Sequence, residues 1–378
     1  MAKNPIVIPV ASGKGGVGKT LISVNLGYAL AQQGKKTILI DLDFGGANIH
    51  TCMGYDIARD GIGNFLNQRA MQLSDYILST DNKNLLLIPG DAEMVGIADI
   101  TANQKKKLMS AILKLDCDYV VLDLGAGSSH NTIDFFMMSP YSIITAMPEL
   151  TSILNAYALL KSSIFRLLYI EFKDNKEIKS LFNHQLKQGG ESSWKVADLL
   201  NKIFEIDPEI HIKAVALLDT INPKLIINMA TLPKDIEMGE RLRKISNNYL
   251  SVKIDYLGFL YRDKLVSKSI SMRKPLALLA PSNQTYQTIM RIAYKIINSS
   301  KKYNTLYDIE HYDGSYEEVI EEASEDLLSR IDGYHELADE NLLTINELIS
   351  LVKNLEYENL TLKKEIEELK YKLLKYKK

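Results

Sequence analysis

Short apolar runs alternate with helix-length segments through the first 300 residues of the chain. Near-continuous Val, Ile and Leu runs are typical of strands buried on both faces of a parallel sheet, with helices in the connections. The sequence therefore predicts an α/β fold, a mostly parallel twisted sheet flanked by helices. The predicted strands are Ile6–Ala11, Thr37–Asp43, Leu85–Pro89, Tyr119–Leu124, Ser142–Ala146, Leu225–Met229 and Leu257–Tyr261.

Helices are predicted in the connections between these strands. Gly34 follows the first of them and suits a C-terminal cap. Between Tyr169 and Lys224 the alternation changes to helix-like pieces, which predicts a helical insertion at about 170–223. Extra helices that cover a sheet edge and a surface that docks a partner both explain such an insertion. The predicted helices are Lys19–Gln33, Gln104–Leu115, Thr151–Tyr169, Glu171–Leu186, Trp194–Phe204, Asp235–Asn247 and Asn283–Asn298, with a turn at 188–193.

The end of the chain carries a heptad pattern. Leucine recurs every seven residues from Leu348 to Leu369, and a second apolar series is interrupted only by Asn359. A single polar core residue of this kind often fixes register in a two-stranded coiled coil. We expect a coiled coil over 345–378 that pairs two chains. A helix packed back on its own domain, or a lysine-rich tip (370–378) that contacts a membrane surface, are the alternatives.

Charge divides the chain into three parts, although the net charge is only −2. Residues 1–304 hold 36 Lys and Arg against 28 Asp and Glu, residues 305–347 hold 14 acids against Arg330, and the remainder has a net charge of +3. These shifts, together with the heptads, predict a domain over 1–304, an acidic helical linker over 305–344 and the coiled coil over 345–378.

Composition excludes several other classes of protein. No continuous apolar run reaches the ~18–20 residues that span a bilayer, and the first residues show no secretory pattern. The two cysteines, Cys52 and Cys117, are too few for a disulfide scaffold or a four-cysteine zinc site. We therefore expect a cytoplasmic protein.

The strongest chemical signal is the glycine-rich segment GKGGVGKT at Gly13–Thr20, which follows a predicted strand and opens a predicted helix. That context is the one a phosphate-binding P-loop requires, since backbone N–H groups and the helix N-terminus surround the anion. In such a loop Lys19 reaches the β- and γ-phosphates and the Thr20 hydroxyl binds Mg²⁺. The sequence thus predicts ATP and Mg²⁺ as cofactors.

The second lysine of this loop, Lys14, marks a narrower class. The loop resembles that of the deviant Walker-A ATPases, the family of the Min, Par and flagellar-number regulators, at all eight positions. The resemblance implies an ATP-sandwiched homodimer in which Lys14 reaches the phosphates of the other subunit. It extends over most of residues 5–304, and the continuation at Phe44–Asn48 is closer to the Min and flagellar-number branch than to the partition ATPases.

The resemblance also assigns roles to residues outside the loop. Asp43 matches the acid that positions the attacking water, Asp41 an acid near the Mg²⁺ shell, and Asp123 the Walker-B acid. Asn228 matches a residue that reads adenine. The implied site is therefore catalytic Lys14, Lys19 and Asp43; nucleotide-binding Gly13, Lys14, Gly15, Gly16, Val17, Gly18, Lys19, Thr20 and Asn228; and metal-binding Thr20, Asp41 and Asp123.

Two functions fit this sequence. The first is a slow, partner-stimulated ATPase that switches between monomer and dimer, or opens and closes its heads, to position a structure at a membrane or pole. It implies an activating protein partner and a peripheral membrane contact. The alternative is a partition-type ATPase that binds DNA nonspecifically, with Lys35-Lys36 and Lys105–Lys107 as candidate phosphate contacts. A metal-cluster carrier is disfavoured because the chain has no Cys-x-x-Cys pair.

Overall fold

The computed structural model describes residues 4–56, 61–67, 71–90, 100–187, 195–299 and 316–326, with Ile349, Val352, Lys353 and Ile366. The chain divides into two compact units, with the boundary after Ser324. The first unit contains the sheet and its helices. The predicted coiled coil apart from Ile349, Val352, Lys353 and Ile366, and the predicted linker apart from residues 316–326, lie outside the described residues, so both stay predictions.

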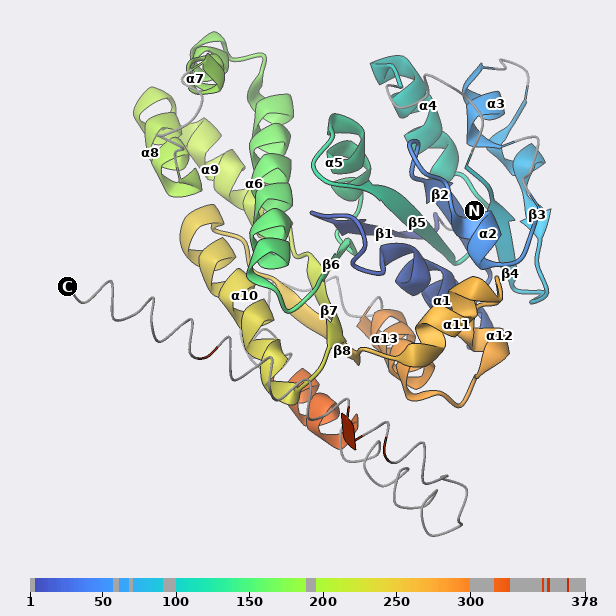
Figure 1. Cartoon of the computed structure of the whole chain (residues 1–378). Coiled ribbons are helices and arrows are strands. Elements are labelled where there is room, and N and C mark those ends of the chain that lie inside the picture. Colours follow the sequence, from blue (N-terminus) through green and yellow to red (C-terminus); the bar gives the residue numbers. More distant parts are fainter. Residues whose placement is uncertain are drawn as a thin grey trace. The chain divides into compact units, whose positions relative to one another are not determined.

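The first unit is built on an eight-stranded sheet in the order β3-β4-β2-β5-β1-β6-β7-β8 (Figure 1). Neighbouring strands run parallel except β3, which pairs antiparallel with β4. The α/β prediction is confirmed, and each predicted strand is present; only the two-residue β3 was not anticipated. The strands are β1 Ile6–Ser12, β2 Thr37–Leu42, β3 Leu78–Ser79, β4 Leu85–Ile88, β5 Tyr119–Ala126, β6 Ile143–Ala146, β7 Lys224–Ala230 and β8 Asp255–Tyr261.

Helices cover both faces of this sheet. On one face α1 and α13 pack against each other, and on the other α5, α6 and α10 lie side by side (Figure 1). Strand burial follows from this, since β1, β2 and β8 have nearly every side chain buried. The helices are α1 Lys19–Gln32, α2 Ile49–Cys52, α3 Ile62–Asn67, α4 Ala102–Ile112, α5 His130–Phe136, α6 Leu150–Phe172, α7 Lys176–Lys187, α8 Val196–Ile206, α9 Pro208–Asp219, α10 Ile236–Leu250, α11 Lys264–Ser271, α12 Leu276–Leu279 and α13 Gln284–Ser299, with 3₁₀ turns at Leu73–Tyr76 and Pro233–Asp235.

Strand order places the carboxyl ends of three strands together. From β1 the chain moves to β2 on one side, and it later returns through β5 to β6 on the other side of β1. Ligands of open α/β sheets bind outside the carboxyl ends of the strands at such a switch point. The loops after β1, β2 and β5 are therefore the expected site, and all the predicted site residues except Asn228 lie in or beside them.

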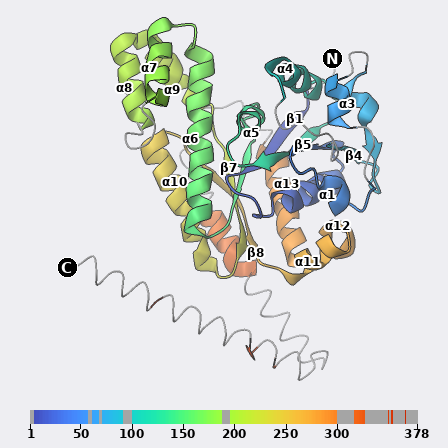
Figure 2. The same cartoon turned by 45° about the horizontal axis from the view of Figure 1, so that its top comes forward.

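The predicted insertion consists of α7, α8 and α9, which lie beside α6 and away from the strands (Figures 1 and 2). Helix α9 was not anticipated, although Asp207 caps it by accepting hydrogen bonds from two backbone N–H groups and Pro208 occupies its first turn. The turn predicted at 188–193 lies outside the described residues.

Residues 316–326, within the segment predicted as an acidic linker, form a helix whose residues up to Ser324 belong to the first unit. Val319 and Ala323 are buried, and the Tyr261 hydroxyl donates a 2.6 Å hydrogen bond to the Ala323 carbonyl. Lys295 of α13 forms an ion pair of 3.1 Å with Glu322. At the start of the helix, the Tyr316 ring packs on Tyr256 of β8 and lies beside the buried guanidinium of Arg243 in α10. This helix therefore touches both helical layers.

Among the described residues, α6 alone is long and apolar enough to cross a membrane by length and composition. Its apolar positions are not continuous, which is why counting apolar runs in the sequence did not single it out. In the structure α6 packs against α5, α10 and the strands β1 and β6.

An ion-pair cluster joins α4, α5 and α6. The Asp134 carboxylate accepts hydrogen bonds from Lys105 and from Arg166, whose Nη2 lies 2.8 Å away. Burial alone would raise the pKa of Asp134, but these two cations outweigh it and lower the pKa below its usual value. The cluster therefore contributes to stability above about pH 4, the unfolded-state pKa of an aspartate, and the contribution is lost as the pH falls through the lower folded-state value.

An Asp134→Asn variant is expected to lose about 2 kcal/mol of unfolding free energy at pH 7, because Lys105 and Arg166 then keep buried charges without a counter-ion. Urea denaturation at pH 7 and pH 3 measures this, and the loss should shrink at pH 3. Asp116→Asn is the control, since Asp116 is 93% exposed in its pair with Lys36 and its removal should leave the midpoint unchanged. Equal destabilisation by both variants would contradict the expectation.

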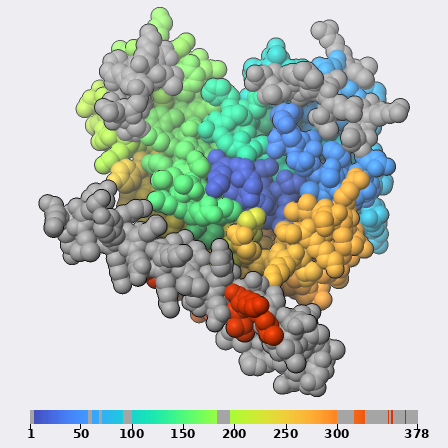
Figure 3. Space-filling view, in the orientation of Figure 1, coloured from blue at the N-terminus to red at the C-terminus, as the bar shows by residue number. Residues whose placement is uncertain are grey.

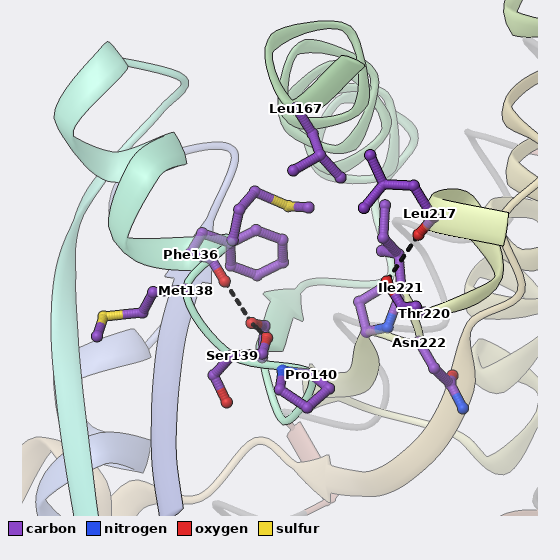
Figure 4. Close-up of a pocket in the computed structure, with 12 residues that line it drawn as sticks. Phe136, Met138, Ser139, Pro140, Leu167, Leu217, Thr220, Ile221 and Asn222 are labelled. Carbon is purple, nitrogen blue, oxygen red and sulfur yellow. Dashed lines mark hydrogen bonds between the residues drawn. The ribbon is translucent and has the colours of Figure 1, made fainter. Parts of the chain in front are cut away.

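A cavity of about 250 Å³ lies at the amino ends of β6 and β7, opposite the P-loop end of the sheet (Figure 4). Its Ser139, Ser142 and Thr220 hydroxyls all donate to backbone carbonyls. Since it lies at the other end of the strands, it is no part of the site assembled below. It is lined by Phe136, Met137, Met138, Ser139, Pro140, Ser142, Leu167, Leu217, Thr220, Ile221, Asn222 and Pro223.

Candidate nucleotide-binding site

The P-loop connects β1 to α1 and relies on its glycines for its shape. Gly16 and Gly18 have φ angles of 80° and 87°, in the left-handed region that favours glycine. Gly13 meets α6 so closely that an added Cβ would lie 2.1 Å from the backbone oxygen of Asn155. The loop lies in a part of the chain that reaches the molecular surface. Figure 3 shows the dark-blue N-terminal segment at the surface between the green and orange parts of the chain.

The Asp123 carboxylate, in the second half of β5, faces the first turns of α1. It is 1% exposed and lies 3.1 Å from Lys19 Nζ, and the Thr20 hydroxyl donates a 2.7 Å hydrogen bond to it. Burial raises the pKa of Asp123, and the Lys19 ammonium opposes that rise. The structure thus brings together the predicted phosphate lysine, metal-binding hydroxyl and Walker-B acid.

Asp41, at the end of β2, is the register partner of Asp123 and is also 1% exposed. Both of its carboxylate oxygens accept hydrogen bonds from backbone N–H groups. Oδ1 accepts from Asp43 at 3.1 Å, and Oδ2 accepts from Asn48 and Ile49 at 2.9 and 3.0 Å. Burial and then the neighbouring Asp123 charge raise the pKa of Asp41 to about 7, although these hydrogen bonds oppose the rise. These hydrogen bonds mean that Asp41 holds in place the loop that carries Asp43, although Asp41 also lies next to the predicted metal position.

Asp43 lies at the mouth of the same group, with Oδ2 4.0 Å from Lys19 Nζ and its side chain 27% exposed. A Cβ added at Gly125, two residues after Asp123 in β5, would be 3.4 Å from Asp43 Oδ1, so the small residue leaves room for this carboxylate. The next residue, Phe44, packs on Phe135 of α5 with ring centroids 6.3 Å apart. The loop after β2 therefore lies against the end of β5 and against α5.

Lys14 points away from this cluster. Its Nζ lies 3.1 Å from Glu149 Oε2, at the N-terminus of α6, and the two side chains are 34% and 49% exposed. Lys14 is thus placed at the rim of the loop, with its charge held by a carboxylate of its own chain.

Asn228, near the end of β7, is 4% exposed and donates a 2.8 Å hydrogen bond to the Val17 carbonyl of the P-loop. A Cβ at Gly18 would lie 2.3 Å from its amide nitrogen. The structure therefore places Asn228 directly against the loop and ties its amide to the loop backbone, and its adenine-reading role stays a prediction.

Comparison with known proteins agrees with this geometry. A family model described as an AAA domain matches residues 6–178. The flagellum site-determining protein YlxH of Helicobacter pylori is 27% identical over 304 residues, which cover 78% of this chain and 83% of that protein. The septum site-determining protein MinD of Buchnera aphidicola is 33% identical over 156 residues, 41% of this chain and 57% of that protein. The chain is similar to MinD/ParA-type P-loop ATPases, and it spans about half the length of the MinD relative.

The fold is also similar to that of a solved MinD structure. The structure of MinD from Pyrococcus horikoshii, complexed with Mg-ADP, superposes with a TM-score of 0.52 at 17% identity, over 78% of this chain and 97% of that one. The residues also fit the cofactors. Mg²⁺ prefers hard oxygen donors, few carboxylates and nucleotide phosphates, and Thr20 and Asp123 supply a hydroxyl and a carboxylate beside the phosphate loop.

Two residues of this candidate site were missed by sequence reasoning. Ser23 donates a 2.9 Å hydrogen bond to Asp123, and Glu149 pairs with Lys14. A signal for Ser23 was present, since it lies four residues after Lys19 on a predicted helix and hence on the same face. Glu149 has no such signal, because its contact joins segments 135 residues apart.

Proposed function

We propose that this chain is a Mg²⁺-dependent ATPase that works as a dimeric switch in the placement of a division site or flagellum. The observation that carries the proposal is the convergence of Lys19, Thr20, Asp43 and Asp123 beside the P-loop. Phosphoryl transfer to water needs positioning and charge neutralisation more than covalent chemistry, and this set supplies both.

Each residue has a role in this proposal. Lys19 would neutralise the β- and γ-phosphates, and Thr20 and Asp123 would hold the metal. Bound Mg²⁺ would neutralise phosphate charge and orient the β- and γ-oxygens. Asp43 is close enough to Lys19 to face the terminal phosphate, where its carboxylate orients the attacking water.

The dimer is part of the proposal because of where Lys14 lies. Its side chain is at the rim of the loop, next to the exposed first turn of α6, where Leu150 and Leu154 are 59% and 51% exposed. Such a face suits contact with a second copy, in which Lys14 would leave Glu149 for the partner's nucleotide. If the C-terminal heptads already pair two chains, ATP would close the heads rather than recruit them.

The alternative, nonspecific DNA binding, loses part of the support that its lysines gave. Lys105 is buried against Asp134 and Lys107 donates a 2.6 Å hydrogen bond to the Phe65 carbonyl, whereas Lys36 and Lys106 stay exposed. Electrostatic binding of a phosphate backbone needs exposed cations. The burial of Lys105 and the carbonyl contact of Lys107 therefore favour the positional switch. In this proposal the protein is cytoplasmic, contacts the membrane peripherally and is stimulated by an activating partner.

Cellular localisation of an Asp43→Ala variant, tagged at its N-terminus, tests the proposal. A variant that binds ATP without hydrolysing it should accumulate on its target, so enrichment at the membrane or a pole is the expected result. Spread over the nucleoid would favour the DNA-binding alternative instead. A diffuse signal identical to that of a Lys19→Ala variant would contradict both.

A further inference from the structure

The hydrogen bonds on the Asp123 carboxylate come from three side chains of α1. Lys19 Nζ and the Ser23 hydroxyl lie 3.1 and 2.9 Å from Oδ1, and the Thr20 hydroxyl lies 2.7 Å from Oδ2. Oδ1 is thus shared by a lysine and a serine, whereas Oδ2 faces only the threonine among the contacts that the described residues make. Ser23 is fully buried, one helical turn beyond Lys19.

Two of these three donors have other tasks in a nucleotide-loaded site. The proposed function, on which this inference rests, directs Lys19 to the phosphates and Thr20 to the metal. Both side chains can then no longer hold Asp123 as they do here. Ser23 has no such second ligand, because it is buried behind the carboxylate, and the alternative acceptor within its reach is the Lys19 carbonyl at 3.1 Å.

We propose that Ser23 is the positioning residue for the metal-binding carboxylate: it holds Asp123 Oδ1 so that Oδ2 faces the metal shell. The Ser23 hydroxyl has one proton, and a carboxylate is a stronger acceptor than a peptide carbonyl. Donation to Asp123 is therefore favoured whenever Asp123 is ionised.

Partners behind a metal ligand typically change metal affinity by 10- to 100-fold when they are removed. For Ser23→Ala we expect about a tenfold loss in the factor by which Mg²⁺ strengthens nucleotide binding. Affinity measured without Mg²⁺ should be unchanged, because Ser23 makes no contact with the phosphate loop beyond Lys19. Ser23→Thr keeps the hydroxyl and should restore the Mg²⁺ effect.

The test titrates the full-length chain with a fluorescent ADP analogue in Mg²⁺ and in EDTA. Ser163→Ala is the matched control, since Ser163 is 1% exposed in α6 and donates to the carbonyl four residues before it but to no carboxylate. Thermal melting of each variant without nucleotide identifies a general loss of structure. If that loss occurs in Ser23→Ala, the comparison of Ser23→Thr and Ser23→Cys decides, because the weak thiol donor should keep the fold but lose the Mg²⁺ effect.

The proposal is overturned if Ser23→Ala retains the full Mg²⁺ effect, or if Ser163→Ala loses as much. It is supported if only Ser23→Ala loses the effect and only the hydroxyl of threonine restores it. Failure of the proposed function is distinguishable, because the unmodified chain would then bind the nucleotide neither with nor without Mg²⁺.

Discussion

Replacing Asp43 with alanine is expected to slow ATP hydrolysis by at least about a hundredfold while leaving Mg-ATP affinity nearly unchanged. Asp43 lies 4.0 Å from Lys19 at the open mouth of the site, whereas the groups that hold phosphate and metal lie deeper. Removal of the Asp43 carboxylate should remove only an interaction made with the attacking water. Such a loss lowers the rate of hydrolysis rather than the affinity for Mg-ATP. Phosphate release over hours, with nucleotide binding measured in parallel, gives both quantities.

Asp56→Ala is the control for this variant, because Asp56 is an exposed acid of the same region, outside the site. The assignment of Asp43 would be wrong if its variant kept the unmodified rate. If its variant lost ATP binding instead, Asp43 would belong to the groups that hold the metal or the phosphates.

The second large effect is expected for Gly13→Ala. The new Cβ would meet the oxygen and carbon of Asn155 at 2.1 and 2.2 Å and the nitrogen of Ala156 at 2.6 Å. All three are backbone atoms of α6, so no rotamer change relieves the contact and the loop or the helix must move. We expect a loss of about 3 kcal/mol in unfolding free energy, and ATP binding weakened because the loop is displaced.

Gly15→Ala separates this effect from a general intolerance of the loop. A Cβ at Gly15 meets no atom within 4 Å, and its φ is not in the left-handed region. Urea denaturation of the two variants should show destabilisation in Gly13→Ala alone. Equal stability of both would mean that α6 yields to the loop at little cost, contrary to the packing seen here.

Much of this site could be predicted from the sequence, because its chemistry lies in short local motifs. The P-loop has glycines and a lysine at fixed spacing, and Asp41 and Asp123 each end an apolar run. Their proximity follows from strand order, since β2 and β5 are neighbours and pair Asp41 with Asp123. The role of Asp41 could not be foreseen, because its backbone partners in the loop depend on how residues 43–49 fold.

Surface charge was harder to interpret than the motifs. The three consecutive lysines at 105–107 suggest a solvated cationic patch, yet α4 turns Lys105 toward Asp134 and Arg166 lies on the far side of that acid. No local sequence pattern indicates that Lys105 pairs with Asp134, which lies 29 residues away. Helix α9 was missed for a different reason: its start signals, Asp207 and Pro208, were present, but its exposed face carries Ile212 and Val215 and blurs the periodicity.

The helix of residues 316–326 has a consequence for how copies of this chain can assemble. It contacts β8 and the helices on both sides of it, so the last strand of the sheet does not offer a long open row of backbone donors and acceptors. At the other end β3 is only two residues long. Sheets with a covered edge and a short edge resist strand-by-strand polymerisation. Growth of a continuous β-sheet from one copy of this chain to the next is therefore disfavoured at both edges.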